Sequence, residues 1–223
     1  MLVHGGHASA REFFTPRTAP SYDAVVAVTT FGRDMAWKRL ILSRLGPGHP
    51  RVLDLACGTG ILSSKLAGEG KQVAGLDLTF DYITQAGKKM ELAFVQGNAE
   101  VLPYRDGVFD AIVSSYLAKY IDAELLADEC WRVLAQGGIA VFHDFTCPEG
   151  TMRRLWDAYF SLLRLAGRLS KSWRPVFENL DTVICKSDWV NKIVDAMERR
   201  GFSDIRFSSH TCGTAAIVEG KKP

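Results

Sequence analysis

The chain has no long apolar run, no internal repeat and no strong excess of charge of either sign. Its 27 lysines and arginines nearly balance 25 aspartates and glutamates, so the net charge of +2 gives no general reason to expect nucleic-acid binding. No apolar stretch approaches the roughly eighteen residues of a membrane span. The start, Met1 to His7, lacks the basic segment and long apolar core of a signal peptide. We therefore expect a cytoplasmic protein that binds no nucleic acid.

The cysteines also lack a pattern. The five cysteines are odd in number and lack the paired spacing of a zinc site or a disulfide framework. We expect reduced thiols, no metal site, and a packing role for Cys57. The 223 residues, 47% of them hydrophobic, are enough for one domain with a sizeable core.

The run from Val52 to Gly60 is the most informative feature that is present. An apolar strand ends in an acid and a glycine turn, and a helix begins near Ile61. Gly58 and Gly60 lack Cβ atoms, so a ligand can approach the backbone closely. The amides at the start of the helix favour a carboxylate or a phosphate, and they do not distinguish between the two. The run lacks the full dinucleotide spacing and any Gly-Lys-Ser/Thr ending, which weakens nicotinamide and nucleotide-triphosphate interpretations.

Polar residues follow the next two predicted strands. Asp77 ends the second strand, seventeen residues after Gly60, where an acid can accept both hydroxyls of a ribose. Asn98 ends the third strand, and its amide can bond an adenine edge. These three strand ends predict a binding site for one adenosine.

Apolar segments alternate with helical ones along the chain, which predicts an α/β fold with a doubly wound, mostly parallel sheet. We expect an N-terminal arm and helical cap over residues 1–48, irregular or mobile over 1–20 and helical from 22 to 45. The core follows over 49–223. Its last two strands form a hairpin, which makes one strand antiparallel. The predicted strands are 51–55, 71–76, 92–96, 109–114, 138–145, 203–209 and 214–219, and the core helices are about 61–68, 80–89, 122–134 and 188–200.

A helical lid is expected at 149–186, because this insertion after the fifth strand is longer than a crossover needs. Residues 151–175 carry six basic side chains against Asp157 alone. One interpretation packs the apolar face on the sheet; another lets the segment line a pocket for a lipophilic substrate or touch an anionic membrane. The predicted apolar face holds Met152, Leu155, Trp156, Tyr159, Leu163 and Ala166, and the polar face Arg153, Asp157, Ser161, Arg164 and Arg168.

Taken together, these motifs resemble the class I S-adenosylmethionine-dependent methyltransferases. The resemblance is closer still to the ubiquinone/menaquinone biosynthesis C-methyltransferase family, and it covers roughly residues 20 to 220. The core matches are Leu53 to Gly60, Leu76-Asp77, Gly97 to Glu100, Leu102-Pro103, Phe109-Asp110, Arg132 to Leu134 and Gly137-Gly138. Those towards the ends are Tyr22-Asp23, Thr30 to Gly32, Trp37 to Arg39, Phe145-Thr146, Pro148, Gly201-Phe202 and Thr214 to Ala216.

The resemblance implies a seven-stranded class I methyltransferase fold and S-adenosylmethionine as cofactor. It places Thr59 and its glycine loop at the methionine end, with Ser115 beside them. Asp77 is expected at the ribose, and Asn98 with the Ala99 amide at the adenine. The cofactor-binding residues expected are Asp54, Ala56, Gly58, Thr59, Gly60, Asp77, Leu78, Asn98, Ala99 and Ser115.

Methylation of an aromatic carbon needs an electron-rich ring, so a general base is expected near the transferred methyl. Asp144 and His143 end the fifth strand, and Lys119 follows the fourth. Tyr22, on the cap, is expected to shape the cofactor pocket more than to transfer a proton. These four residues are the catalytic candidates.

The chain departs from the quinone enzymes near the expected acceptor site. Lys119-Tyr120 replaces an Arg-Asn pair, Val26 an asparagine, and Asp34-Met35 a His-Arg pair. The leading hypothesis is C-methylation of a prenylated quinol in respiratory quinone biosynthesis. Two alternatives stay open: methylation of another small or lipophilic acceptor, and a non-catalytic S-adenosylmethionine-binding module. Contact with a membrane surface and a homodimer are open as well.

Overall fold

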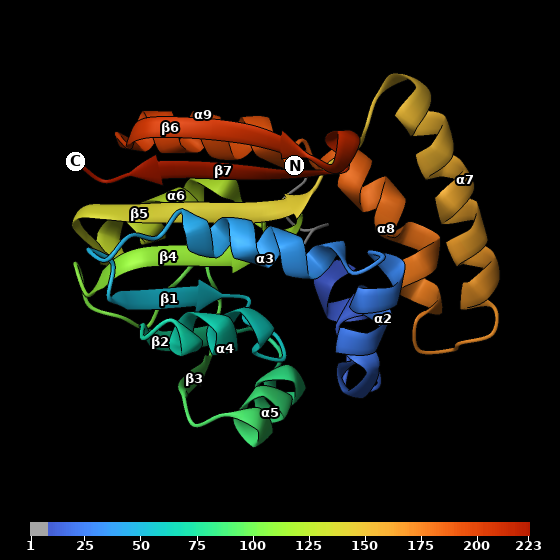
Figure 1. Ribbon diagram of the computed structural model, residues 1–223, viewed down its shortest axis with the longest axis horizontal. Coiled ribbons are helices and arrows are strands. Elements are labelled where there is room, and N and C mark those ends of the chain that lie inside the picture. Colours follow the sequence, from blue (N-terminus) through green and yellow to red (C-terminus); the bar gives the residue numbers. More distant parts are fainter. Residues whose placement is uncertain (1–8) are drawn as a thin grey trace.

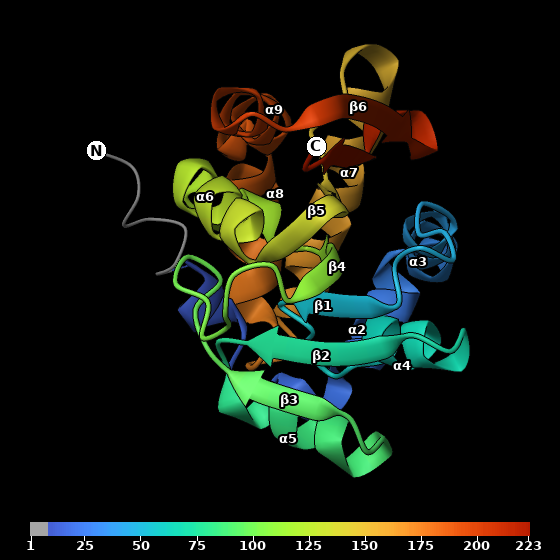
Figure 2. The ribbon, with the colours of Figure 1, turned by 90° about the vertical axis from the view of Figure 1, so that its left-hand side faces the viewer.

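The computed structural model describes residues 9–223, which form one seven-stranded sheet with helices on both faces (Figure 1 and Figure 2). The strand order is β3-β2-β1-β4-β5-β7-β6. β7 pairs antiparallel with β5 and β6, and the other pairs are parallel. This confirms the doubly wound, mostly parallel α/β fold. The strands are β1 Arg51–Leu55, β2 Gln72–Asp77, β3 Ala93–Gln96, β4 Phe109–Ser115, β5 Leu134–Phe145, β6 Ser203–His210 and β7 Ala215–Lys221.

Helices follow the predicted pattern closely, and the segments expected at 61–68 and 80–89 have those bounds. β5 begins four residues earlier than predicted, because Leu134 already pairs with Phe109 before a register shift. The α-helices are α2 Tyr22–Thr29, α3 Arg33–Ser43, α4 Ile61–Gly68, α5 Phe80–Lys89, α6 Ala123–Val133, α7 Gly150–Gly167, α8 Arg174–Ser187 and α9 Trp189–Arg200. Short 3-10 turns are η1 Ala19–Ser21, η2 Ala118–Tyr120 and η3 Thr211–Gly213.

Alternate residues of the central strand β1 supply the two halves of the core, because side chains along a strand point to opposite faces. Leu53 packs in one cluster with Leu126 of α6 and Ile193 of α9. Val52 packs in the other with Leu62 of α4. Burial on both faces explains the nearly continuous apolar sequence of this strand.

The carboxyl ends of β1, β2, β4 and β5 meet at one edge of the sheet. In Figure 1 the arrows of β1, β4 and β5 point towards the side of the molecule that α2, α7 and α8 occupy. Ligands of open α/β sheets bind at this edge, where neighbouring connections leave in opposite directions. The order β2-β1-β4 places that switch between β1 and β4.

The lid is an antiparallel pair of helices, α7 and α8 (Figure 1). Trp156, Phe160 and Ile184 are buried between them, and Arg164 binds Asp181 across the pair at 2.7 Å. The expected apolar face of α7 is wrong in two positions: Leu155 is 63% exposed, and Ala166 is exposed as well. α8 covers only part of the apolar side of α7, so these two side chains stay exposed.

Cys147 and Cys185 form a disulfide, so the prediction of reduced thiols throughout is wrong. They lie 38 residues apart, a separation with no recognisable motif. The helix pair returns the chain to the end of β5 and brings their Cα atoms to 4.8 Å, within the usual range for a disulfide. The bond therefore ties the last turn of α8 to the start of the lid.

The expected irregular arm is ordered over the residues that the structure describes, and residues 1–8 lie outside them. Residues 9–13 are helical. Phe13 is 1% exposed and packs with Tyr120 of η2 and Trp173 beside the lid. The arm therefore covers the edge of the sheet, because its aromatic side chains find a hydrophobic surface there. Within residues 9–223, no helix combines the length and apolar character needed to cross a membrane.

Candidate active site

The loop between β1 and α4 has the backbone shape that its glycines allow. Ala56, Gly58 and Gly60 have φ of 55°, 55° and 82°. A Cβ on Gly60 would lie 3.1 Å from both Ala86 of α5 and Met90, so this position must stay small. The Gly58 amide donates to an Asp77 carboxylate oxygen at 2.8 Å. The glycine loop and the end of β2 are thus joined directly.

A first cavity, of about 90 Å³, lies beside this loop. It gathers residues from the ends of β1, β2 and β3, as their strand-end positions predicted, and from the end of β4. The expected cofactor residues that line it are Ala56, Gly58, Asp77, Leu78, Asn98, Ala99 and Ser115.

Asp77 presents a polarised carboxylate to the first cavity. Its second oxygen accepts the Thr79 amide at 2.8 Å, in addition to the bond from Gly58. Burial raises the pKa of Asp77, and the two amide donors oppose that shift. Each oxygen has a further lone pair, so the carboxylate can also accept bonds from ligand hydroxyls.

Asn98 is oriented by its own loop. Its side-chain oxygen accepts the Glu100 amide at 3.0 Å, and its side-chain nitrogen lies 3.5 Å from a Glu100 carboxylate oxygen. Such an Asx turn fixes the side chain at the cavity wall.

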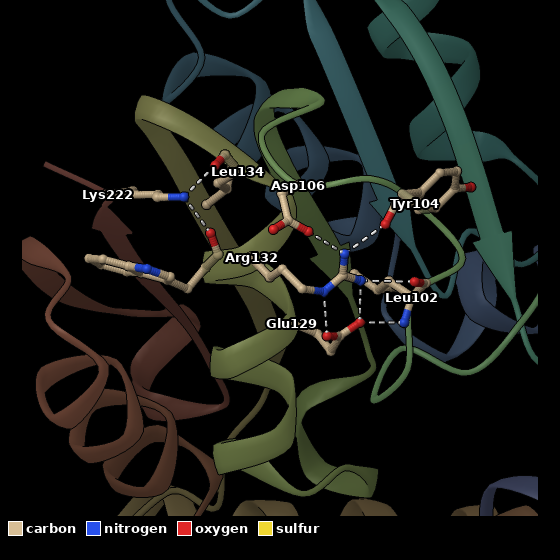
Figure 3. Close-up of polar contacts among 8 residues, drawn as sticks. Leu102, Tyr104, Asp106, Glu129, Arg132, Leu134 and Lys222 are labelled. Carbon is tan, nitrogen blue, oxygen red and sulfur yellow. Dashed lines mark hydrogen bonds and ion pairs between the residues drawn. The ribbon is translucent and has the colours of Figure 1, made fainter.

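Arg132 of α6 holds the rest of this loop. Its guanidinium donates to the carbonyls of Leu102 and Tyr104 and to the carboxylate of Glu129, all at 2.7–2.9 Å (Figure 3). Glu129 in turn accepts the Leu102 amide at 2.6 Å. A planar group with five N–H donors suits this fan of acceptors. Arg132 therefore positions the segment that follows Asn98.

A third cavity, about 30 Å³, adjoins the first and is also lined by Ala56, Gly58 and Ser115. The expected residues Asp54 and Thr59 line it. Burial raises the pKa of Asp54 to about 7, although Ser63 donates to it at 2.6 Å. Thr59 donates its hydroxyl to Asp23. Gly60 is not among the lining residues of these cavities, so its structural role is the close contact with α5.

Asp34 and Lys38 also line the third cavity, a position that was not expected for them. Both are buried on α3 and form an ion pair. Asp34 accepts the Tyr116 hydroxyl as well, at 2.8 Å. Lys38 falls within the family match at Trp37 to Arg39, which was the available signal. A cation and two carboxylates in this small space can hold the charged ends of an amino acid.

A second, much larger cavity, about 570 Å³, lies under the lid. Tyr22 and Tyr116 line the second cavity and both smaller ones, so their rings stand where the three meet. The wall is mainly apolar and comes from the arm, α2 and the lid. It includes Phe14, Val25, Val26, Phe31, Trp37, Tyr120, Phe145, Met152, Leu155, Trp156, Tyr159, Phe160, Leu163, Trp173, Phe177 and Ile184.

Tyr22 has an intact phenol group at this junction. Burial raises its pKa well above the ordinary value, and the neighbouring Tyr82 adds to the shift. Its ring lies 5.3 Å from that of Tyr82 and stacks on Trp173 at 6.2 Å between centroids. Tyr22 therefore presents a neutral, firmly packed phenol where the cavities meet.

Lys119 places a buried amine at the wall of the second cavity. It donates to Asp144 at 2.6 Å and to the Tyr116 carbonyl at 3.0 Å, and its nitrogen lies 4.4 Å from the centroid of the Tyr120 ring. The Lys119 and Asp144 side chains are 2% and 0% exposed. Burial lowers the pKa of Lys119 and raises that of Asp144, while their attraction opposes both shifts. Lys119 lines the cavity, and Asp144 stands behind it.

His143 is set back from the cavities. It is 1% exposed, and its Nδ1 lies 3.0 Å from the Ser115 hydroxyl. Burial lowers its pKa well below the ordinary value, with Lys38 and Lys119 contributing, so the ring is neutral. Its Nε2 is buried without a hydrogen-bond partner among residues 9–223. Of the four catalytic candidates, Lys119 and Tyr22 line the large cavity. Asp144 binds Lys119, and His143 contacts Ser115, which lines the two smaller cavities.

Comparison with known proteins agrees with this geometry. The model of the ubiE/COQ5 methyltransferase family matches residues 7–222. A demethylmenaquinone methyltransferase of Thermus thermophilus is 31% identical over 216 residues, covering 92% of this chain and 98% of the relative. A ubiquinone/menaquinone biosynthesis C-methyltransferase of Shewanella halifaxensis is also 31% identical, covering 92% and 87%.

Solved structures share the fold at low identity. A possible histamine N-methyltransferase of Thermotoga maritima is 17% identical with a TM-score of 0.66, covering 93% of this chain and 98% of that one. A Haemonchus contortus phosphoethanolamine N-methyltransferase in complex with S-adenosyl-L-methionine is 18% identical with a TM-score of 0.64, covering 84% and 52%.

Proposed function

The chain belongs to the ubiE/COQ5 methyltransferase family of S-adenosylmethionine-dependent enzymes, and from this we propose that it methylates a ring carbon of a prenylated quinol resembling demethylmenaquinol. The observation that carries the proposal is the large apolar cavity, which joins the smaller ones at Tyr22 and Tyr116 and has the Lys119 amine in its wall. An apolar wall suits an isoprenoid tail, and a buried amine suits the hydroxyl of a phenol. The product would belong to respiratory quinone biosynthesis.

The two smaller cavities fit the parts of S-adenosylmethionine. Asp77 would accept the ribose hydroxyls, and Asn98 with the Ala99 amide would bind the adenine. The ion pair of Asp34 and Lys38 and the carboxyl of Asp54 supply charges that complement the amino and carboxylate groups of the methionine end. When bound, this cofactor supplies an electrophilic methyl group, so the protein chiefly has to align the acceptor and exclude water.

Lys119 is the residue we assign to the acceptor hydroxyl. Burial lowers the pKa of Lys119, which favours the uncharged amine, the form that would accept the phenol proton. Once protonated, the amine stabilises the resulting oxyanion by a charge-assisted hydrogen bond. Asp144 holds the amine at 2.6 Å, and its carboxylate balances the positive charge of the amine once that is protonated. Tyr22 supports the acceptor ring beside the cofactor.

One observation favours a second candidate, methylation of another lipophilic acceptor. The departures from the quinone enzymes at Val26, Lys119 and Tyr120 all line the large cavity. Lysine cannot reproduce the planar, two-pronged donor of arginine. The cavity can therefore take an acceptor whose polar groups differ from those of demethylmenaquinol.

The test is incubation with S-adenosylmethionine labelled in its methyl group and a short-tailed demethylmenaquinol. We expect label in the quinol, a large loss of activity in Lys119→Met, and unchanged activity in the matched control Lys88→Met, whose side chain is exposed. Label entering a different lipid of a cell extract, and none entering the quinol, would decide for the second candidate. Tight cofactor binding by calorimetry with no labelled acceptor would indicate a binding module and refute the catalytic assignment.

A further inference from the structure

The outer face of α7 is apolar, and no part of residues 9–223 covers it. Four leucines, Leu155, Leu162, Leu165 and Leu169, are 63%, 67%, 58% and 92% exposed. The first three are spaced by seven and three residues, which puts them on one side of the helix, and Leu169 continues that side just past its end. Figure 1 shows α7 as the outermost helix of the lid. Single exposed leucines are ordinary, but a contiguous row of them marks an interaction surface.

This surface continues onto the end of α2. Phe31 is 81% exposed, and its ring lies 5.8 Å from that of Tyr159 on α7. The Tyr159 hydroxyl donates to the Thr29 carbonyl at 2.6 Å, which joins the two helices. Eleven large apolar side chains stand out as exposed in residues 9–223. Six of them lie on or just after α7 or α2: the four leucines, Val28 and Phe31. We call the four leucines and Phe31 the docking face.

Unpaired basic side chains lie beside the docking face. Arg154, Arg168 and Lys171 are exposed, and no ion pair of theirs is found in the described part of the chain. On α7, the helical repeat places Arg154 next to the leucines and Arg168 beyond it. The other two arginines of the helix are neutralised, Arg153 by Asp157 and Arg164 by Asp181. The charge left over is therefore positive and sits at the border of the apolar row.

The docking face also contains the rim of the large cavity. Phe31 and Leu155 both line that cavity while being 81% and 63% exposed, so the cavity reaches the surface between them. A lipophilic molecule that enters there would cross an apolar surface without passing through water.

We propose that the docking face binds the surface of a membrane containing anionic lipids, and that the acceptor enters the cavity from the bilayer between Phe31 and Leu155. Leucines bordered by unpaired arginine and lysine match the acyl chains and anionic headgroups of such a surface, as in interfacial amphipathic helices. The entry route rests on the proposed function, because it assumes a lipophilic acceptor. The membrane contact itself rests only on the exposed face and its charge.

Vesicle co-sedimentation tests the contact without any substrate. We expect the protein to bind vesicles of phosphatidylcholine with 30% phosphatidylglycerol (about 30% is enough to give a clearly negative surface) and to bind pure phosphatidylcholine much less. The double variant Leu162→Glu/Leu165→Glu should bind at least about tenfold more weakly, and Arg168→Glu about fivefold or more. Leu125→Glu and Arg105→Glu are exposed control changes on other elements and should bind as the wild type does.

Binding that is absent, or equal for the docking-face and control variants, would overturn the proposal. Analytical ultracentrifugation of the same proteins tests whether a second copy of the chain covers the docking face instead. A dimer that Leu162→Glu/Leu165→Glu dissociates, with no vesicle binding, would assign the face to a second copy of the chain and also overturn the proposal.

Activity separates this proposal from the proposed function. Neither Leu162 nor Leu165 is among the lining residues of the cavity, so their double variant should methylate a short-tailed quinol in solution as the wild type does. It should lose at least about tenfold of the rate on a long-tailed quinol embedded in vesicles, in parallel with its binding. If the wild type methylates neither quinol, the quinol is not the acceptor and the proposed function is refuted. Vesicle binding still decides whether the docking face contacts a membrane. Equal rates on the embedded quinol would refute the entry route.

Discussion

The buried ion pair between Lys119 and Asp144 allows a quantitative test of how the active site is built. Lys119→Met keeps the length and apolar stem of the side chain and removes the amine. The variant loses the bonds of 2.6 Å to Asp144 and 3.0 Å to the Tyr116 carbonyl. A carboxyl that is 0% exposed is then left without a counter-charge.

The expected cost follows from that burial. Removing one partner of a buried pair destabilises a protein by about 3–5 kcal/mol, because the remaining charge must be buried alone or neutralised. For a domain of this size, each kcal/mol lowers Tm by roughly 2–4 °C, which predicts a fall of about 6–20 °C. Asp144→Asn should cost a similar amount, since the amide keeps one acceptor for the Phe145 amide but leaves the ammonium unpaired.

The double variant Lys119→Met/Asp144→Asn completes the cycle. We expect it to cost less than the sum of the single changes by roughly 2–3 kcal/mol, as for two residues in direct contact. Urea unfolding at pH 7.5, followed by tryptophan fluorescence, measures all four proteins, with Lys88→Met as a surface control within about 0.5 kcal/mol of wild type. Single changes costing under about 1 kcal/mol, or strictly additive changes, would show that the two groups do not form a buried pair.

Three further predictions concern the cofactor side. Asp77→Ala should weaken S-adenosylmethionine binding by about 1–3 kcal/mol in calorimetry, because the ribose hydroxyls lose their acceptor, and an unchanged affinity would remove that role. The pKa of Asp54 is about 7 in the folded state and about 3.9 in the unfolded state. The folded state therefore binds this proton more tightly, and the contribution of Asp54 to stability is lost as pH rises from about 4 to 7. Across that range the stability of wild type relative to Asp54→Asn should therefore fall, by up to roughly 4 kcal/mol in denaturant titrations, and a flat difference would contradict the shift. Arg132→Gln should lower the free energy of unfolding by about 2–4 kcal/mol and also weaken cofactor binding, because the loop after Asn98 loses its clamp; normal affinity in a destabilised variant would confine Arg132 to folding.

The alternating pattern of the sheet and its helices could be predicted from the sequence because local signals agree there. Strand β1 carries a nearly continuous apolar run, and glycines stand where the backbone turns, as at Gly58 and Gly60. Strand-end positions predicted that the glycine turn, Asp77 and Asn98 lie together, because parallel strands end at one edge, whereas Ser115 was expected there from the family resemblance.

The rest depends on contacts between distant segments. Asp34 and Lys38 lie on a helix before the first strand, so strand-end reasoning could not place them in the third cavity. The sequence placed Lys119 and Asp144 after neighbouring strands, but only the structure shows that they pair and that the lysine is the one facing the cavity. The exposed row on α7 was missed for a related reason: periodicity predicts an apolar face without predicting how much of it a neighbour covers.

The first and second cavities draw mainly on different parts of the chain, and this has a consequence for how the enzyme can change. The first cavity draws chiefly on the continuous stretch from the β1 loop to η2, residues 56–121. The second is walled mainly by both flanks, residues 14–37 and 145–184, and receives Tyr116, Lys119 and Tyr120 from the middle stretch. Exchange of residues 145–184 between relatives should therefore change the apolar wall that the acceptor meets, because these residues line neither of the smaller cavities and Lys119 stays in place. In this way one scaffold can come to methylate different acceptors by replacing its lid around an unchanged cofactor site.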